Sequence, residues 1–177
     1  MKKETRTLYH QLVNARYGTY RGFIRLWLAW LETYLGRLKR YSDVDLERVE
    51  RLVFVCLGNV CRSPYAELIA LEKGLPCASF GLSTTTGATA FCDAIKTAEA
   101  LNRDLSEHRA THMGDFEIRD TDLLLVMEVR HALALERNPG TSGAQIALLG
   151  FWSRPRRPHI HDPMNLSMDY FRNCYLT

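Results

Sequence analysis

The chain has no hydrophobic run long enough to cross a membrane. Its longest apolar stretch, residues 23–31, contains Arg25 and is followed by Glu32, whereas a membrane-spanning helix needs about 20 consecutive apolar residues. Residues 4–22 are too polar to form the apolar segment of a secretory signal. These absences lead us to expect a cytoplasmic protein.

Cysteine is present in an odd number and without regular spacing. A secreted disulfide framework is therefore not expected, and a reducing compartment is the default. Two of the five cysteines lie close together, and we expect the other three to be small buried apolar residues: Cys77, Cys92 and Cys174.

Charge is unevenly distributed along the 177 residues. Residues 1–41 carry nine Lys or Arg and two Glu, a net charge of +7, while residues 42–177 carry fourteen Lys or Arg and eighteen Asp or Glu, a net charge of −4. This asymmetry divides the chain into a basic helical extension with its linker, residues 1–50, and an acidic domain, residues 51–177.

We call the basic extension before the linker, residues 1–41, the arm. Its sequence predicts a short helix over about residues 5–16 and a longer one over about 19–41. Apolar side chains of the longer helix recur at helical spacing: Phe23, Trp27, Trp30, Leu31, Tyr34, Leu35 and Leu38. We expect this face to pack on the protein's own domain or to form a homodimer through residues 19–41. Docking on a membrane surface is the alternative. Nucleic acid is not expected as a partner, since basic residues accompany a large apolar face.

The remaining chain alternates between strand and helix patterns, which is typical of a parallel sheet. We expect an α/β fold: an open parallel four-stranded sheet with helices on both faces and the N-terminal helical extension. The predicted strands are 52–55, 77–80, 122–127 and 145–149, and the predicted helices are 64–74, 90–102 and 128–137. Ser63 and Pro64 indicate the N-cap and first turn of the first of these helices.

The stretch "VCLGNVCRSP" joins the first strand to this helix. Ligands of open α/β sheets bind at the carboxyl ends of the strands. Gly58 permits a tight turn whose backbone N–H groups, with the helix N-terminus, form an anion-binding nest. Arg62 adds a planar fork of donors suited to two phosphate oxygens. Such a field favours the nucleophilic thiolate of Cys56, to which Ser63 can donate a hydrogen bond.

Two other interpretations of this loop are weaker. A zinc site would need Cys56 and Cys61 with further ligands such as His159 and His161, but Arg62 beside a divalent cation is unfavourable. Two buried structural cysteines would not explain the Gly-Asn turn or the Ser-Pro helix start.

The loop resembles the signature loop of the low-molecular-weight protein tyrosine phosphatases, almost completely from Cys56 to Pro64. Four later segments resemble that family in the same order: "SFGLS", "DLSEHRA", "TDLLLVME" and "HIHDPMN". The likeness covers about residues 52–170 and leaves the arm outside it.

The resemblance implies a phosphomonoester hydrolase that needs no cofactor or metal. Cys56 would form a phosphocysteine intermediate, Arg62 and the loop would hold the phosphoryl group, and Asp162 would be the general acid and base. Cys61 is either a redox partner of Cys56 or a packed side chain. The phosphate-binding and supporting residues would be Leu57, Gly58, Asn59, Val60, Cys61, Ser63, Ser79 and a buried His108.

Two departures from the family pattern affect the substrate and the C-terminus. Family members that act on phosphotyrosine usually carry aromatic residues after the Asp-Pro pair, where Met164 and Asn165 stand here. The substrate is thus a phosphorylated protein or a small phosphomonoester, with Phe151, Trp152 or the arm as substitute walls. Only fifteen residues follow Asp162, so the terminal helix is either short or cut off.

Two functions outside phosphatase chemistry are alternatives for this sequence. An arsenate reductase on this fold would need a further redox cysteine pair, which Cys77 and Cys92 do not obviously supply. A catalytically idle module that binds phosphorylated ligands would have no use for the retained Cys56, Arg62 and Asp162.

Overall fold

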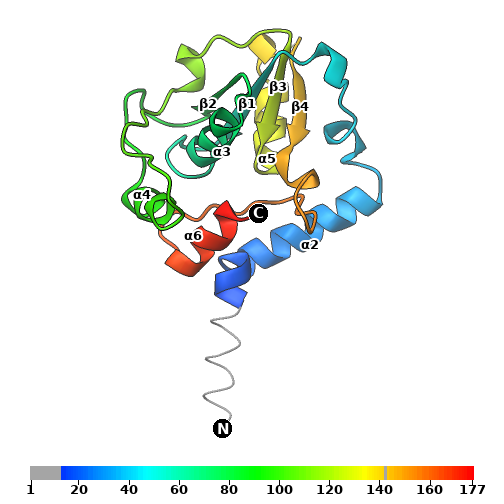
Figure 1. Ribbon diagram of the computed structural model, residues 1–177. Coiled ribbons are helices and arrows are strands. Elements are labelled where there is room, and N and C mark those ends of the chain that lie inside the picture. The colour runs from blue at the N-terminus through cyan, green and yellow to red at the C-terminus, as the bar shows by residue number, and fades with distance from the viewer. Residues whose placement is uncertain (1–12, 142) are drawn as a thin grey trace.

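A computed structural model describes residues 13–141 and 143–177 and shows an α/β fold built on a parallel sheet (Figure 1). The sheet has four strands in the order β2-β1-β3-β4. Their bounds are β1 Arg51–Cys56, β2 Cys77–Gly81, β3 Asp122–Val126 and β4 Gln145–Leu148. The predicted four-stranded parallel sheet is therefore confirmed.

The central strand β1 determines which side chains reach each face of the sheet. It pairs in parallel with β2, Val55 opposite Phe80, and with β3, Val55 opposite Val126. Because successive strand residues point to opposite faces, Val53 and Val55 enter one apolar cluster while Phe54 and Cys56 enter another. Both faces of β1 are thus covered, as its continuous apolar sequence predicts.

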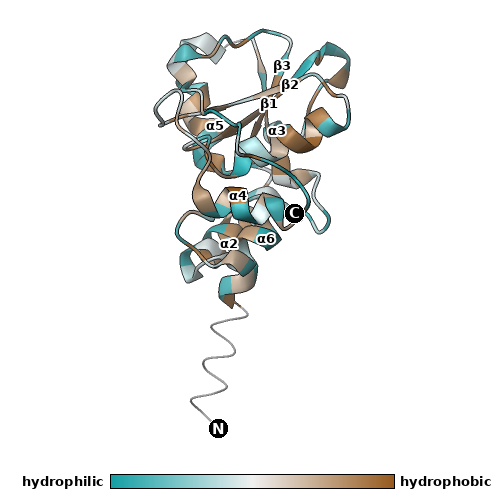
Figure 2. Cartoon of the chain, turned by 60° about the vertical axis from the view of Figure 1, so that its left-hand side comes forward, coloured by the Kyte–Doolittle hydropathy of each residue, from teal (hydrophilic) through white to brown (hydrophobic). Residues whose placement is uncertain are grey.

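The helices cover both faces of the sheet. On one face α3 (Arg62–Glu72) packs against β1 and β2, while α5 (Val129–Glu136) packs against β3 and β4, with buried side chains in the opposite cluster. Beyond the carboxyl ends of the strands lie α4 (Cys92–Glu99), the short terminal helix α6 (Met168–Tyr175), and α2 (Tyr20–Tyr34), as Figures 1 and 2 both show.

Two predicted helix ends were wrong. The long arm helix was expected to reach residue 41, but α2 ends at Tyr34 because Gly36 adopts a left-handed φ of 73°, a usual helix stop. Ser63 was expected to be an N-cap, but α3 begins one residue earlier, at Arg62, with Cys61 as its N-cap. Of the short arm helix, residues 5–12 lie outside the described residues, while 13–17 are helical.

The end of the arm enters the core of the protein. Leu38 is 4% exposed and Tyr41 is 2% exposed, and both join the cluster that contains Val53 and Val55. The Tyr41 hydroxyl donates to Glu136 Oε1 at 2.9 Å. The end of the arm, from Leu38 to Tyr41, therefore contributes to the core of the domain.

Apart from Leu38, the apolar residues expected on this face are exposed, contrary to the expectation that the face packs on the protein's own domain. The buried residues of α2 are Gly22 and Ala29, whereas Trp27 is 60% exposed and Tyr34 is 88% exposed. Small side chains let the helix approach the body closely, and the aromatic side chains lie on its other side. Within the described residues, α2 and the other helices are too short or too polar to cross a membrane.

Candidate active site

The side chains of Cys56, Ser63 and Asn59 meet at the carboxyl end of β1. Cys56 Sγ lies 3.1 Å from Ser63 Oγ and accepts a hydrogen bond from the Asn59 backbone N–H at 3.2 Å. Asn59 Nδ2 donates to Ser63 Oγ at 2.9 Å. Because that oxygen already accepts from Asn59, its own hydroxyl proton is free to point at the sulfur. Two donors thus converge on Cys56 Sγ, an arrangement that stabilises a thiolate.

Asn59 holds the shape of the loop through every polar atom of its side chain. Its backbone has a φ of 50°, in the left-handed region that Asn tolerates better than most residues. Nδ2 also donates to Ser79 Oγ at 2.7 Å, and Oδ1 accepts from the Thr111 N–H at 2.8 Å. His108 Nε2 lies 2.8 Å from the Asn59 carbonyl oxygen. His108 is half-buried, where the sequence led us to expect a buried histidine.

The carbonyl groups of the loop are turned outward. Outside partners donate hydrogen bonds to the carbonyls of Cys56, Leu57, Asn59, Val60 and Cys61. In a trans peptide the N–H of the next residue points opposite to the carbonyl. The N–H groups of the following residues therefore face the inside of the loop, as in an anion nest: Leu57, Gly58, Val60, Cys61 and Arg62.

Arg62 is 3% exposed, and its guanidinium is held from two sides. Nη1 donates to Glu128 Oε1 at 2.7 Å and to the Ile160 carbonyl at 2.9 Å, and Nη2 donates to Asp162 Oδ2 at 2.7 Å. Among the described residues, Nε has no hydrogen-bond partner although it is buried. A buried donor without a partner is costly, and a phosphate oxygen would satisfy it.

Glu128 is a site residue that sequence reasoning missed. Glu128 ends the segment "TDLLLVME", but the sequence alone predicts no role for it. The carboxylate is 1% exposed. Burial alone would raise its pKa, yet Arg62 and Arg130 lower that pKa to about 2. Glu128 therefore stays ionised, and its negative charge holds the Arg62 guanidinium in place. An acidic residue directly after a buried strand, facing a loop arginine, was the available signal.

The arm contacts the segment that carries Asp162. Thr19 Oγ1 lies 3.1 Å from His161 Nε2, and a Cβ added at Gly22 would lie 2.8 Å from His161 Cδ2. Arg25 reaches to 4.0 Å from Glu128 Oε2. Between α2 and the site lies a pocket of about 300 Å³ lined by Arg25, Leu28, Ala29, Glu32, Glu128, Val129, Arg130 and His159.

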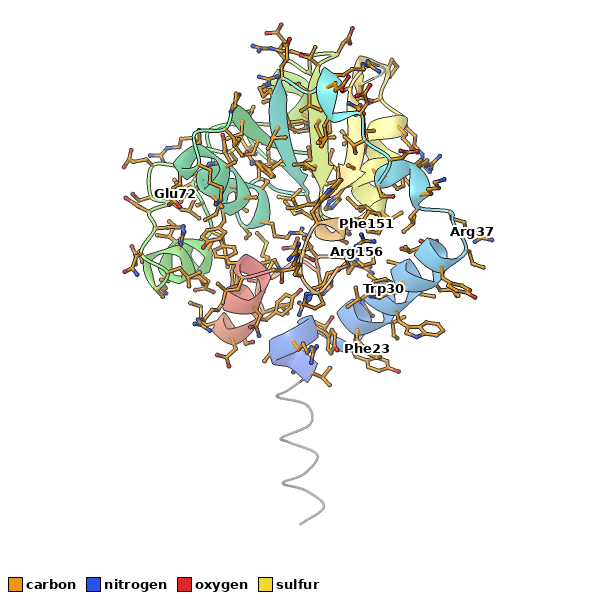
Figure 3. All side chains as sticks on the ribbon, turned by 45° about the vertical axis from the view of Figure 1, so that its right-hand side comes forward. Phe23, Trp30, Arg37, Glu72, Phe151 and Arg156 are labelled. Carbon is orange, nitrogen blue, oxygen red and sulfur yellow. The ribbon has the colours of Figure 1, made fainter. Side chains whose placement is uncertain are left out.

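Phe151 cannot serve as a wall of the site. It is 7% exposed and belongs to the core cluster, and Figure 3 shows it inside the molecule between the sheet and α2. Trp152 lines an apolar groove that Leu149 and Arg62 also line, so its role as a wall stays a prediction. The arm contributes Arg25 and Glu32 to the nearby pocket instead of an aromatic ring.

Cys61 is 2% exposed, and burial raises the pKa of its thiol. All five cysteines lie within the described part of the chain and are free. Cys77 is half-buried and Cys92 is exposed, so the expectation that they are buried was wrong for Cys92. Cys61 as a redox partner of Cys56 stays a prediction.

Comparison with known proteins places this site in a family. A sequence model of the low molecular weight phosphotyrosine protein phosphatases matches residues 51–177. The low molecular weight protein-tyrosine-phosphatase Wzb of Salmonella typhi is 36% identical over 127 residues, which are 71% of this chain and 84% of that protein.

Solved structures agree. The tyrosine phosphatase AmsI of Erwinia amylovora matches with a TM-score of 0.61 and 36% identity, over 72% of this chain and 84% of AmsI. Vibrio vulnificus Wzb, solved in complex with benzylphosphonate, matches with a TM-score of 0.57 and 25% identity, over 71% of this chain and 89% of that one.

Fold and loop together define an α/β phosphatase. The chain belongs to the low molecular weight phosphotyrosine protein phosphatase family, which confirms the resemblance that the sequence predicts. The family match begins at Arg51, so α2 and the rest of the arm lie outside it.

Proposed function

We propose that the protein hydrolyses phosphomonoesters of the protein-phosphotyrosine type through a phosphocysteine intermediate on Cys56. One observation carries the proposal: Cys56 Sγ accepts the Asn59 N–H at 3.2 Å in a loop whose carbonyls are bonded outward. The sulfur thus sits at the base of a cradle of N–H groups. A cradle of this kind binds the oxygens of a phosphoryl group and not an extended apolar ligand.

The first step transfers the phosphoryl group to the protein. The Cys56 thiolate attacks phosphorus, and a sulfur–phosphorus bond forms as the bond to the leaving oxygen breaks. Arg62 and the loop N–H groups hold the three equatorial oxygens. Asp162 in its protonated form gives its proton to the leaving oxygen, which departs as an alcohol or phenol.

The second step releases phosphate. Asp162, now a carboxylate, takes a proton from a water molecule that attacks phosphorus and breaks the sulfur–phosphorus bond. The electron pair returns to Cys56 Sγ, and the hydroxyl of Ser63, 3.1 Å away, stabilises the thiolate as it leaves. Inorganic phosphate is the product, and the proton that Asp162 takes from the water restores its starting protonation state.

We expect an aryl ester to react faster than an alkyl ester for a chemical reason. A phenol is a better leaving group than an aliphatic alcohol, and the Vibrio relative binds benzylphosphonate, which carries an aromatic ring. The names of the relatives include tyrosine phosphatase. We therefore propose phosphotyrosine in a protein as the substrate, ahead of a small phosphomonoester.

The two rival functions have less support. The comparisons are with phosphatases, and an arsenate reductase on Cys56 would need a reducing cysteine pair. Exposed Cys92 and half-buried Cys77 belong to different elements, α4 and β2. A catalytically idle binding module would not need an acid, yet Asp162 is bonded directly to Arg62.

Turnover of an aryl phosphate tests the proposal. We expect vanadate-sensitive hydrolysis by the wild-type chain, loss of all measurable turnover in Cys56→Ser, and a kcat lowered by roughly 10²–10⁴-fold in Asp162→Asn. Cys92→Ser, at an exposed cysteine outside the loop, is the matched control and should keep full turnover. Phosphotyrosine and phosphoserine peptides of one sequence then compare the leaving groups.

Two results would contradict the proposal. Turnover that survives in Cys56→Ser would exclude Cys56 as the nucleophile. Arsenate-dependent consumption of thiol without phosphate release would favour the reductase.

The location and the arm's partner are separate proposals. We place the protein in the cytoplasm, because a free Cys56 thiol needs a reducing compartment. A homodimer through residues 19–41 and docking on a membrane surface are the two candidate roles of the arm, and neither alters the reaction proposed for Cys56.

A further inference from the structure

Nine large apolar residues of α2 and its C-cap are exposed, and they share one side of the helix. Figure 3 shows Phe23, Trp30 and Arg37 along the outer edge of the molecule. Successive residues of a helix turn by about 100°, which places all nine within a continuous sector: Tyr20, Phe23, Ile24, Trp27, Leu28, Trp30, Leu31, Tyr34 and Leu35. We call this sector the outer face of α2. A contiguous exposed patch of this kind marks an interaction site.

The opposite side of α2 fixes the direction in which the outer face points. Gly22 and Ala29 are buried there, about half a turn away from Trp27. At Gly22 even a methyl group would press on His161. Thr19 caps the helix through the Gly22 N–H at 2.9 Å and contacts His161 with the same oxygen. The helix cannot roll to bury its aromatic residues without losing these contacts.

The residue types of the outer face and its surroundings suit the surface of an anionic membrane. Trp and Tyr, which make up four of its nine residues, favour the boundary between lipid and water because their rings are apolar with one polar group. Residues 13–41 carry one acidic residue, Glu32, and six basic ones, of which Arg25 and Arg40 face Glu128 and Glu136 of the body. The other four are Arg16, Arg21, Arg37 and Lys39. This charge complements anionic lipid headgroups.

We propose that α2 docks the protein on an anionic membrane surface, lying in the plane of the interface with its outer face among the lipid headgroups. A second copy of the chain fits less well. Two α2 helices packed face to face would bring Arg16, Arg21, Arg37 and Lys39 of both copies together, eight basic residues against two acidic ones, and like charges repel at short range. Docking also holds the segment of Asp162, which α2 contacts through His161, about one helix diameter, roughly 10 Å, from the lipid.

Vesicle binding by the full chain tests the proposal without reference to catalysis. The probes are large unilamellar vesicles of phosphatidylcholine alone and of phosphatidylcholine with phosphatidylglycerol, at low and high salt. We expect cosedimentation with the anionic vesicles at low salt and weak binding to the neutral ones. In a Trp152→Phe background, tryptophan emission should shift to the blue on binding, because Trp27 and Trp30 are then the remaining tryptophans.

Three sets of variants make the test specific. Trp27→Ser with Trp30→Ser should lower the partition coefficient at least tenfold, while Leu71→Ser, at an exposed leucine of α3, should not change it. Arg21→Gln with Arg37→Gln should lower it about fivefold for each charge removed. Circular dichroism and aryl phosphate turnover check that each variant is folded.

The outcomes separate the candidate partners of the outer face. Binding that depends on anionic lipid and on both tryptophans supports the proposal. A stable dimer in light scattering, lost in the tryptophan variant and unaccompanied by vesicle binding, would show that a second copy covers the face. Vesicle binding that is absent, or unchanged by both variant pairs, also overturns the proposal.

Discussion

Arg62 Nη2 donates a hydrogen bond of 2.7 Å to Asp162 Oδ2, so the phosphate-binding and proton-transferring side chains that we propose are bonded directly to each other. A phosphoryl group in the loop would compete for the same donor. Arg62 is held in place meanwhile by Glu128 and the Ile160 carbonyl through Nη1. Substrate binding can therefore release Asp162 toward the leaving oxygen without moving Arg62.

Glu128→Gln tests this anchoring. The substitution removes the buried anion that faces Arg62, and breaking a buried pair costs about 3–5 kcal/mol. We expect a lower free energy of unfolding and a KM for aryl phosphate raised together with a reduced kcat. Urea denaturation and steady-state kinetics measure both. Glu72→Gln, at an exposed partner of Arg103, is the control and should change the stability by about 0.5 kcal/mol or less. An unchanged KM in Glu128→Gln would show that Arg62 does not depend on it.

Asn59→Ala separates the hydrogen bonds of Asn59 from its backbone strain. Asn59 and Asn102 both have positive φ, 50° and 60°, so alanine at either position costs about 1 kcal/mol of strain. Only at position 59 does the Thr111 N–H also lose its acceptor, while the hydroxyls of Ser63 and Ser79 each lose a donor, at about 1–3 kcal/mol in total. We expect Asn59→Ala to lower kcat more than tenfold and Asn102→Ala to leave turnover intact. Equal losses of activity would contradict the role of Asn59.

Tyr41 tests whether the end of the arm stabilises the fold. Truncation of a buried aromatic side chain costs about 3–5 kcal/mol, so Tyr41→Ala should lower the free energy of unfolding by that amount. Tyr41→Phe removes only the two hydrogen bonds of the hydroxyl, which donates to Glu136 and accepts from Arg40 Nη2, and should cost about 1–2 kcal/mol. The matched control within the arm is Tyr34→Ala, at an 88% exposed side chain, expected within about 0.5 kcal/mol of wild type. Equal stability of Tyr41→Ala and Tyr34→Ala would contradict the packing of Tyr41.

Stability should fall in mild acid because two buried histidines resist protonation. Burial lowers the pKa of His131 to about 3 and that of His159 to about 4, from 6.5. Below pH 6.5 the unfolded chain takes up protons that the folded chain does not, so the free energy of unfolding decreases from about pH 6.5 downward. For His159 the decrease totals about 3 kcal/mol by pH 4. Glu128 adds to the loss below pH 4.5, because its pKa is lowered to about 2.

Denaturation by urea between pH 7.5 and 4.5 measures this dependence. His159→Asn should have a shallower slope against pH than wild type, whatever its stability at neutral pH. A His159→Asn slope equal to that of wild type would show that His159 is not the titrating group.

The sheet and the loop could be predicted from the sequence because their signals are local. The strand β1 is a continuous apolar run, and the residues from Cys56 to Ser63 follow it directly. Gly74, with a left-handed φ of 70°, likewise ends α3 near the position that the sequence indicates. In each case one short segment contains both the residue and the reason for its conformation.

The remaining features depend on contacts between distant segments. Glu128 reaches Arg62 across 66 positions of sequence, and Thr19 reaches His161 across 142. From the local sequence Ser63 is expected to be an N-cap, but its hydroxyl is hydrogen-bonded to Asn59 and Cys56 instead. The amphipathic pattern of α2 was visible, yet the pattern alone does not say which side meets the body. Gly22 and Ala29 decide that, because close approach favours small side chains over large ones.

Because its two sides contact different things, α2 could couple binding at its outer face to the active site. One side contacts His161 next to Asp162, and the other faces outward. A partner on the outer face that moves the helix would therefore also move the segment that carries Asp162, the proposed general acid. Linkage between two sites is reciprocal. A phosphate analogue such as vanadate, bound at Cys56 and Arg62, must then change the affinity of the outer face for its partner by the same factor as that partner changes vanadate affinity. In that case, occupancy of the active site would change how strongly the arm binds the membrane surface.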